Sequence, residues 1–246
     1  MVLAWLRQRV TRNAGIVDIV WAGSMMTSAV YYALVGPGSV EVRLATGVLG
    51  GLWGGRLFVF LLRRVSSEPE DGRYAYLRQY WNDAQGKFLA FFLAQAMFTA
   101  LLSLPFLATV WNRQPLAHWA LAAAIAIWLI SVAGEALADR QLTRFRHDPD
   151  HRGKTCRSGL WRYSRHPNYF FEWLHWFAYP LLAIGSPIAW LAWSGPVLML
   201  VFLYRLTGIP YTEAQAVRSR GDDYRAYQRS TSAFIPWFPK EDIDHV

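Results

Sequence analysis

The chain has 246 residues, of which 54% are hydrophobic, and it carries a formal net charge of +8 at pH 7. Its apolar fraction exceeds the roughly 45–50% of ordinary soluble domains, and its long apolar runs with few charges exclude that class. The basic residues gather in the loops and flanks between these runs, which argues against nucleic acid as the partner and favours a membrane.

Six apolar runs predict transmembrane helices of about 20 residues each. They cover residues 16–35, 44–62, 88–110, 116–138, 169–185 and 187–206. Because little sequence remains outside them, we expect an all-α, polytopic membrane helical bundle that forms a single domain over residues 1–246. The basic N-terminal flank is not followed by a small-residue cleavage site, and residues 2–14 are expected to form a short helix on the membrane surface.

The distribution of basic residues predicts the orientation of the bundle. All of the 25 Lys and Arg residues except Arg43, Arg56 and Arg113 lie in the N-terminal flank, in loops 63–87 and 139–168, or after residue 204. With six spans, these regions share one side of the membrane, and the positive-inside rule makes that side cytoplasmic. We therefore expect both chain termini in the cytoplasm.

The first two spans contain residues that need an explanation. Asp18 and Arg56 lie near mid-span, where ionisable side chains are functional candidates, although a structural ion pair between them would lower the cost of burying both. In the second span Gly47, Gly51 and Gly55 recur every four residues. This pattern favours close helix packing, and the alternative is room for a flat ligand between helices.

Two further patterns follow on the side that we expect to be cytoplasmic. Loop 63–87 begins with helix breakers up to Gly72 and then predicts a short interfacial helix with Tyr74 and Leu77 on its apolar face. At the end of the fourth span, Glu135 and Asp139 share one helical face. These like charges need a cationic or hydrogen-bonding partner. Candidates are Arg144 and Arg146, or the amide and hydroxyl groups of a ligand.

Metal chemistry has little support in the sequence. Cys156 is the single cysteine, so an intramolecular disulfide and a Cys-based cluster are both excluded. His147 and His151 are four residues apart, as zinc ligands can be, but no glutamate stands between them in the HExxH pattern. We expect no metal site.

The stretch GLWRYSRHPNYFFEW, residues 159–173, places polar side chains at the start of the fifth span. Pro167 is suited to the first turn of a helix, which would put Asn168 and Glu172 on one face. The helix N-terminus, together with Arg162, Arg165 and His166 before it, predicts an anion site suited to phosphate. Lipid headgroups would explain the arginines alone, whereas a phosphorylated cofactor with a polar ring explains the Asn and Glu as well. His175, in an aromatic setting, is expected to be a core histidine.

The tail after residue 206 is predicted to be structured. Thr212 is suited to cap a helix that begins near Glu213. Gly221 is expected to end that helix, and Asp222 to cap the next one. Trp237 and Phe238, which lie between two prolines, predict an interfacial anchor.

These segments together carry a family resemblance. The stretch 159–173, with EALADRQLTRF before it and DDYRAYQRSTSAFIPW after it, resembles the steroid 5-alpha-reductase-like integral membrane reductases, above all their bacterial branch. The superfamily includes sterol reductases and, more distantly, isoprenylcysteine carboxyl methyltransferases. The resemblance covers about residues 15–240 and implies a bacterial inner-membrane protein that binds NADPH in the half covering about 116–240. Phe171 stands where the family usually has glycine.

The resemblance also implies roles for individual residues. Asn168 and Glu172 match the pair that holds the nicotinamide end of NADPH, and Glu135 and Asp139 match a pair at its adenosine part. Arg146 matches an arginine near the phosphates. The full expected cofactor-binding set is Glu135, Asp139, Arg144, Arg146, Tyr163, Arg165, His166, Asn168 and Glu172, with Arg73 and Arg78 as additions.

The implied reaction is hydride transfer to a conjugated carbon–carbon double bond of a lipid-soluble enone that is steroid-like or isoprenoid-like. Tyr211, Tyr169 and Arg56 are candidates to donate a hydrogen bond to the substrate carbonyl, and Glu213 or Asp18 to orient or recharge the donor. Two alternatives stay open: a methyltransferase that uses S-adenosylmethionine, and a non-enzymatic membrane protein that binds lipid. The sequence indicates no oligomeric state.

Overall fold

The computed structural model describes residues 1–206 and 208–240, and within these ranges it contains helices and connecting loops but no β-strand. The predicted all-α class is therefore confirmed. Four helical segments are long and apolar enough to cross a membrane: Val40–Ser67, Gln85–Val110, His118–His147 and Ala189–Arg220. They coincide with the second, third, fourth and sixth predicted spans, and they support a membrane-embedded protein.

The other two predicted spans are helical but do not meet the same criteria. The first corresponds to α2 (Ile16–Val35), a helix of 20 residues. The fifth is divided into α8 (Pro167–His175) and the short α9 (Ala178–Leu182). Between them the backbone tightens into three-residue turns, in which the N–H groups of Trp176 and Phe177 donate to the carbonyls of Trp173 and Leu174. The total of six spans stays a prediction.

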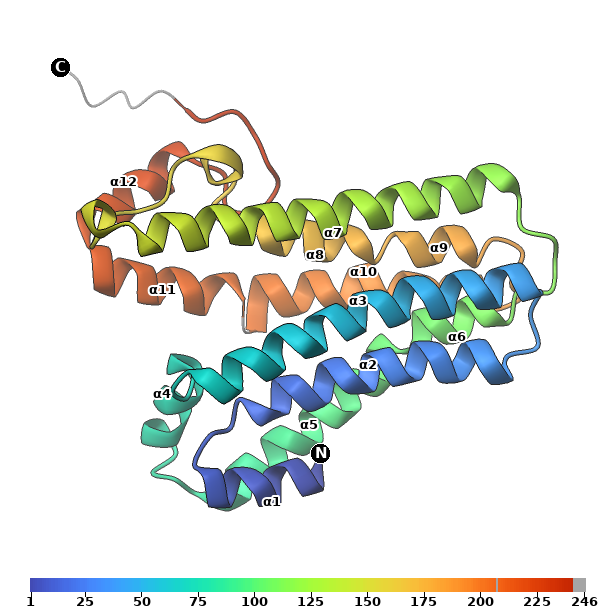
Figure 1. The fold of residues 1–246 in the computed structure, drawn as a ribbon, viewed down its shortest axis with the longest axis horizontal. Helices are drawn as coiled ribbons and strands as arrows, with labels where there is room; N and C mark the ends of the chain where they lie inside the picture. The colour runs from blue at the N-terminus through green and yellow to red at the C-terminus, as the bar shows by residue number, and fades with distance from the viewer. Residues whose placement is uncertain (207, 241–246) are drawn as a thin grey trace. The chain divides into compact units, whose positions relative to one another are not determined.

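The chain forms two compact units, whose helices are labelled in Figure 1. The first unit contains Met1–Ala122 and Tyr179–Gly195, and the second contains Ala123–Ala178 and the chain from Pro196 onward. We describe each unit by itself, and the expectation of a single domain stays a prediction.

In the first unit, α2 packs along α3 (Val40–Ser67), and glycines of α3 face it. A Cβ atom added to Gly47, Gly50 or Gly54 would lie within 2.9 Å of an atom of Ala33, 2.6 Å of one of Ala29 or 2.8 Å of the Met26 backbone, respectively. The predicted helix packing through glycine is therefore confirmed. The closest stripe alternates steps of three and four residues, as 3.6 residues per turn requires, rather than following the predicted Gly47–Gly51–Gly55.

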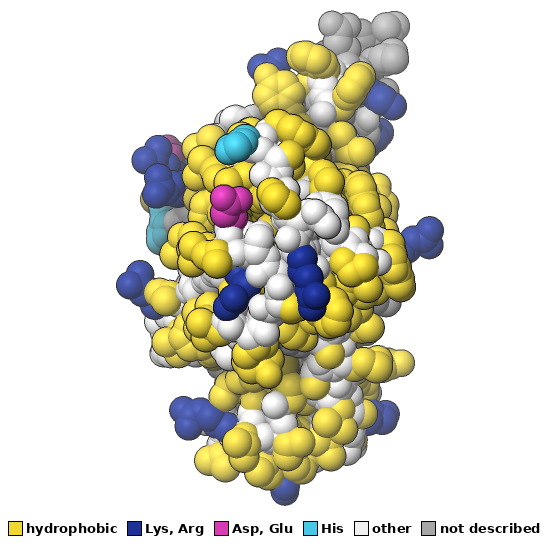
Figure 2. Space-filling view, turned by 90° about the vertical axis from the view of Figure 1, so that its right-hand side faces the viewer, with side chains coloured by type: hydrophobic (Ala, Val, Ile, Leu, Met, Phe, Trp, Pro, Cys, Tyr) yellow, Lys and Arg dark blue, Asp and Glu magenta, His cyan; other side chains and the backbone are white. Residues whose placement is uncertain are grey.

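The opposite face of α3 is exposed and apolar. Leu44, Val48 and Leu52 expose 63%, 51% and 59% of their surface. A helix of a soluble protein usually buries its large apolar side chains, whereas α3 exposes them and buries glycines. This arrangement fits contact of the exposed face with lipid. Hydrophobic side chains also cover most of the surface seen in Figure 2, where charged groups are few.

The glycine contacts predict a difference between two neighbouring substitutions. We expect Gly54→Ala to lower the stability of the protein by about 1–3 kcal/mol, because its methyl group would strike the Met26 backbone, which cannot turn away. Gly55→Ala is the matched control, since its methyl would meet only the flexible Met26 sulfur at 3.3 Å. Thermal unfolding in the same detergent measures both, and equal losses would contradict the assignment of Gly54 to the contact face.

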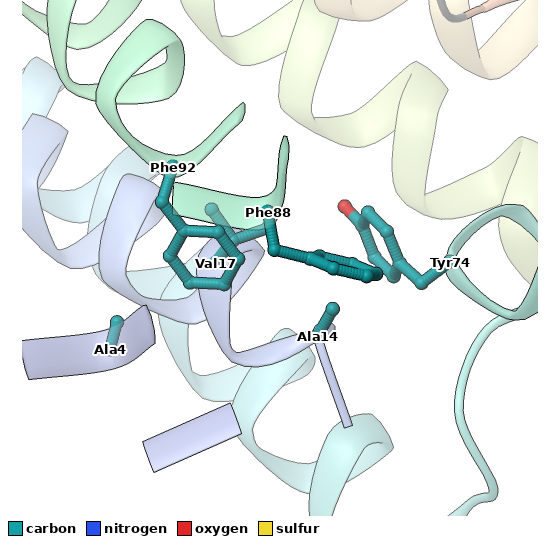
Figure 3. Close-up of a cluster of buried hydrophobic side chains, with 6 residues drawn as sticks. All are labelled: Ala4, Ala14, Val17, Tyr74, Phe88 and Phe92. Atoms are coloured by element: carbon teal, nitrogen blue, oxygen red, sulfur yellow. The ribbon is translucent and has the colours of Figure 1, made fainter. Parts of the chain in front are cut away.

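Three more helices complete one end of this unit. The predicted short helices are confirmed as α1 (Val2–Thr11) and α4 (Gly72–Tyr80), and side chains of both contact α5 (Gln85–Leu102). Asp71 caps α4 by accepting a hydrogen bond from the Arg73 backbone N–H at 2.9 Å. Figure 3 shows the buried cluster that joins these helices, formed by Ala4, Ala14, Val17, Tyr74, Phe88 and Phe92.

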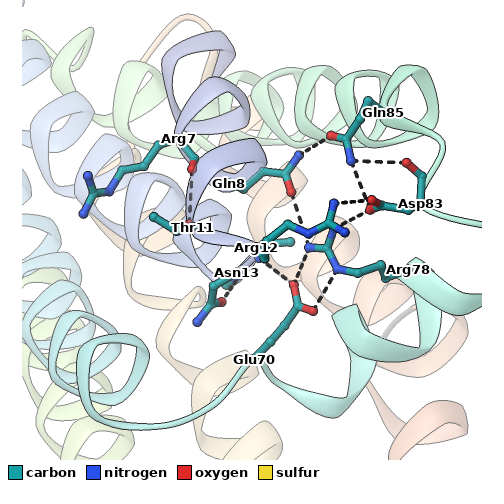
Figure 4. Close-up of polar contacts among 11 residues, drawn as sticks. Arg7, Gln8, Thr11, Arg12, Asn13, Glu70, Arg78, Asp83 and Gln85 are labelled. Atoms are coloured by element: carbon teal, nitrogen blue, oxygen red, sulfur yellow. Dashed lines mark hydrogen bonds and ion pairs between the residues drawn. The ribbon is translucent and has the colours of Figure 1, made fainter.

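A polar network fastens α4 to the same helices (Figure 4). Arg78 pairs with Glu70 at 2.8 Å and with Asp83 at 2.6 Å. The fully buried Gln8 of α1 donates to Gln85 at 2.8 Å. Because Arg78 is occupied by carboxylates in this network, the structure gives it a fastening role in the first unit. This unit also contains most of α9, and α6 (Leu104–Val110) and the 3-10 turn η3 (Ala189–Trp193), which pack together.

The second unit contains most of α7 (His118–His147) together with α8, and the helices that follow it in the chain. These are α10 (Ser194–Val201), a π-helical turn η4 (Phe202–Leu206), α11 (Ile209–Arg220) and α12 (Asp222–Ser230). The 3-10 turns η1 (Pro149–His151) and η2 (Gly159–Arg162) lie in the loop between α7 and α8.

The boundaries of α11 correct one prediction and confirm another. The helix begins at Ile209 with Pro210 in its first turn, so Thr212 is an internal residue whose hydroxyl donates to the Gly208 carbonyl at 2.9 Å. The expected cap at Thr212 is wrong because the Ile-Pro pair already starts a helix. Gly221, with φ of 55°, separates α11 from α12, as predicted, but the expected cap at Asp222 is wrong because Asp222 is the first residue of α12 and Gly221 takes the cap position.

Candidate functional site

Two helices of the second unit place predicted site residues side by side. Pro167 begins α8, as expected, and the Asn168 side-chain amide donates to the Asp139 carboxylate of α7 at 3.2 Å. The Asn168 side-chain oxygen accepts from the Tyr169 backbone N–H at 3.0 Å. The sequence motif at 135–145 and the one at 159–173 therefore meet along one seam between α7 and α8. At this seam Asp139 accepts a hydrogen bond from a neutral amide.

One helical turn further along the seam, Phe171 lies on Gly134. A Cβ atom added to Gly134 would come within 2.5 Å of the Phe171 ring. The bulky Phe171 side chain is thus accommodated by a glycine of α7. This contact puts the next residues along, Glu135 and Glu172, at a similar level of the two helices, where both are partly buried.

The residues just before α8 form a compact ionic group with α11. Glu213 accepts from Arg165 Nε at 2.6 Å, from His166 Nε2 at 3.3 Å and from Gln228 Nε2 at 2.8 Å. Arg165 also donates to the carbonyls of Gln228 at 2.9 Å and Thr231 at 2.6 Å. Only 11% of the Arg165 side chain and 15% of the Glu213 side chain are exposed, so this pair cross-links the start of α8 to the tail.

His166 links the ionic group to two hydroxyl-bearing residues. Its ring stacks on the Tyr169 ring at a centroid distance of 5.3 Å. The Tyr169 hydroxyl lies 3.3 Å from the Thr212 hydroxyl. Because an ionised carboxylate can only accept a hydrogen bond, the His166 tautomer that fits this contact carries its hydrogen on Nε2 and donates it to Glu213. Tyr169, Tyr211 and Glu213 lie in the second unit, with Glu213 well placed to orient His166.

The remaining predicted basic and aromatic residues lie at the surface. Arg144 and Arg146 are exposed in the last turn of α7, where they can meet an anion without first breaking a described ion pair. Tyr163 is 38% exposed, and its ring packs edge-on against Phe238 at a centroid distance of 6.1 Å. Arg162 is also exposed.

Asp18 and Arg56 belong to the first unit. Asp18 accepts a hydrogen bond from the Tyr74 hydroxyl at 2.6 Å and pairs with Arg73 at 3.4 Å. Arg73 also binds the cap residue Asp71 at 3.1 Å, which ties α4 to α2. Burial and the neighbouring Asp18 charge raise the pKa of Tyr74 well above its ordinary value. Sequence reasoning missed this arrangement because 56 positions separate Tyr74 from Asp18.

His166 predicts a pH dependence of stability. Burial lowers its pKa below the ordinary value of 6.5, although the Glu213 carboxylate acts in the opposite direction. As pH falls through about 6.5, the unfolded chain takes up a proton at this site before the folded chain does. The contribution of neutral His166 to the free energy of unfolding is therefore fully present above this pH and is lost below it. We expect the thermal stability to fall between about pH 7.5 and about pH 5.5 by more than it does in His166→Gln.

The matched control for this measurement is His118→Gln, which changes an exposed histidine at the start of α7. It is expected to keep the pH dependence of the unchanged protein. The same pH dependence in all three proteins would show that protonation of His166 does not limit folding stability.

Comparison with known proteins identifies a family for nearly the whole chain. The family described as "Protein of unknown function (DUF1295)" matches residues 4–231. Searches of curated proteins and of solved structures gave no match. Within the described residues, no group of three or more His, Cys, Asp or Glu side chains is placed to hold a metal ion.

Proposed function

We propose that this chain, which belongs to the DUF1295 family, is an NADPH-dependent membrane reductase that acts on a conjugated carbon–carbon double bond of a lipid-soluble enone. The observation that carries the proposal is the seam between α7 and α8. There an Asn amide is bonded to Asp139 while two more carboxylates, Glu135 and Glu172, stand one turn away on the same helices. Intramembrane polar groups of this density are functional candidates by default.

The chemistry of the seam fits the polar parts of NADPH. A nicotinamide carboxamide needs one donor and one acceptor, which Asn168 and Glu172 can supply, and ribose hydroxyls can donate to Glu135 and Asp139. The hydrogen bond from Asn168 to Asp139 uses only one of the two amide hydrogens. Phe171 packs on Gly134, so its ring fills space at the contact between α7 and α8.

The phosphates of the cofactor fit the exposed arginines better than the buried one. Arg144 and Arg146 are exposed in the last turn of α7. Arg165 is held by Glu213 and by two carbonyl groups. We therefore assign phosphate binding to the α7 arginines, and to Arg165 and His166 the positioning of the helix start.

NADPH, when bound, supplies the hydride, and the chain's own residues supply position and a proton. Tyr169 and Tyr211 of the second unit are the candidate donors to the substrate carbonyl, where one good donor lowers a barrier by roughly 3–4 kcal/mol. Asp18 and Arg56 of the first unit stay candidates for the same role. We place this chemistry on the cytoplasmic side of a bacterial inner membrane, because the basic loops gather there by the positive-inside rule.

Binding of two cofactors to the purified protein in lipid nanodiscs tests the proposal. We expect calorimetry to detect NADPH and not S-adenosylmethionine, and a panel of steroid-like and isoprenoid-like enones to contain one that accelerates NADPH oxidation. Binding of S-adenosylmethionine alone would favour the methyltransferase. Binding of neither nucleotide would favour a non-enzymatic lipid-binding protein.

A further inference from the structure

The end of the described chain forms a strap along the residues that precede α8. This strap, residues 231–238, accepts a hydrogen bond from the Arg165 backbone N–H at the Ser232 carbonyl, at 2.8 Å. The buried Ser164 hydroxyl donates to the Phe234 carbonyl at 2.8 Å, and the Trp237 N–H donates to the Tyr163 carbonyl at 2.9 Å. The strap therefore fixes the backbone of residues 163–165, immediately before α8.

The two faces of the strap differ sharply. Phe234 is 3% exposed, and its ring contacts Trp173 at 5.5 Å and Phe170 at 6.0 Å between centroids. Ile235, Trp237 and Phe238 expose 57%, 70% and 76% of their surface. One aromatic side chain holds the strap to the second unit, and three large apolar side chains beside it face outward.

The chemistry of the outward face points to one occupant. Two exposed basic side chains accompany it: Arg162, which directly precedes the Tyr163 that binds the strap, and Lys240, two residues after the strap. Glu241 and Asp242 follow Lys240 in the sequence. Tryptophan with flanking cations is typical of the headgroup region of a bilayer, where anionic lipid attracts the charge. The strap also follows the membrane-crossing segment Ala189–Arg220 by only a short helix, which keeps it near the membrane.

We propose that the outward face of the strap inserts into the headgroup region of the surrounding bilayer, on the side of the basic loops, and that this insertion holds residues 164–166 in place. Pro236 and Pro239 restrict the backbone on both sides of Trp237 and Phe238, so the two rings are presented with little loss of freedom. The strap is thus held on both sides, by the packing of Phe234 in the second unit and by the bilayer around its outward side chains. We call this arrangement the clamp.

A spin-label measurement tests the insertion. In a Cys156→Ser background, which removes the single buried cysteine, Trp237→Cys and Asp222→Cys receive the same nitroxide. Asp222 is the matched control because 95% of its side chain is exposed in the same unit. In nanodiscs with anionic lipid, we expect the label at 237 to be several-fold less accessible to an aqueous nickel complex than the label at 222, and more accessible to oxygen.

Three other outcomes would overturn either the insertion or the charge argument. Equal accessibility of both labels to nickel would show that the strap faces water. Protection of the label at 237 from both nickel and oxygen, with a short label-to-label distance between molecules, would show that a second copy of the chain covers it. An unchanged result when anionic lipid is replaced by phosphatidylcholine would remove Arg162 and Lys240 from the mechanism and overturn the charge argument.

Hydrogen exchange tests the clamp. The double variant Trp237→Ser/Phe238→Ser is expected to accelerate exchange of the Arg165 amide, which donates to the strap, by several-fold in nanodiscs. The matched control is Trp190→Ser, which removes another tryptophan that is 71% exposed but lies in the first unit. If the double variant leaves the Arg165 amide as protected as the control does, membrane insertion does not support the start of α8.

Discussion

Replacing Glu172 with glutamine is expected to reduce NADPH-dependent enone reduction by about 100-fold or more while leaving the protein folded. Glutamine keeps the size of the side chain, so the contact between Phe171 and Gly134 beside it is preserved. What changes is the charge of residue 172, one turn along α8 from Asn168, and the number of hydrogen bonds that its side chain can accept. A cofactor ring held by one fewer polar contact is misplaced relative to the substrate, and small misplacements cost orders of magnitude in rate.

The matched control is Glu41→Gln, which neutralises an exposed carboxylate in the first turn of α3. Rates for the three proteins come from NADPH absorbance with the best enone, and affinities come from calorimetry. Glu41→Gln should behave as the unchanged protein does. If Glu172→Gln binds NADPH and turns over at the rate of the control, the seam does not hold the cofactor and the reductase proposal loses its main support.

Local patterns predicted the elements that depend on local chemistry. The Pro-Asn pair at 167 and 168 marked the start of α8, and the breaker-rich piece before Gly72 marked the start of α4. Apolar run length located the four helical segments that are long and apolar enough to cross a membrane. In each case the deciding interaction lies within a few residues or depends on composition alone, so that the sequence contains it directly.

Partners that are distant in sequence could not be predicted in the same way. Asp18 was expected either to act in catalysis or to pair with Arg56, whereas the structure gives it Tyr74 and Arg73 as partners. The sequence identified Phe171 as a departure from the motif that it resembles, but the place of its ring on Gly134 depends on how α7 and α8 are aligned. Apolar periodicity gives the face of each helix but not its register against a neighbour, and register decides which polar groups meet.

Glu213 illustrates how such contacts change a functional interpretation. As a sequence position it was a candidate to orient a proton donor, and the structure shows that it binds Arg165, His166 and Gln228. Because these three partners lie just before α8 and on α12, Glu213 acts first by holding these segments to α11. Its contribution to chemistry, under the proposed function, comes through His166 and Tyr169 rather than through contact with a substrate.

Replacing Arg165 with methionine is expected to lower the stability of the protein by about 3–5 kcal/mol, because Glu213 would lose its charged partner in a mostly buried site. The carbonyls of Gln228 and Thr231 would lose their donor at the same time. Methionine fills much of the vacated volume, so packing is a minor part of the loss. Reversible unfolding in mixed micelles with increasing dodecyl sulfate measures the difference.

Two further variants separate fastening from cofactor binding. Arg157→Met removes the pair with Asp223, whose side chains are 41% and 40% exposed, and it should cost at most about 1 kcal/mol because exposed pairs contribute little. The double variant Arg165→Met/Glu213→Leu should recover much of the loss, since no charge is then left alone in the site. If Arg165→Met instead leaves stability unchanged and removes NADPH binding, Arg165 is a ligand-binding arginine, and the strap is held to residues 163–165 by its backbone contacts.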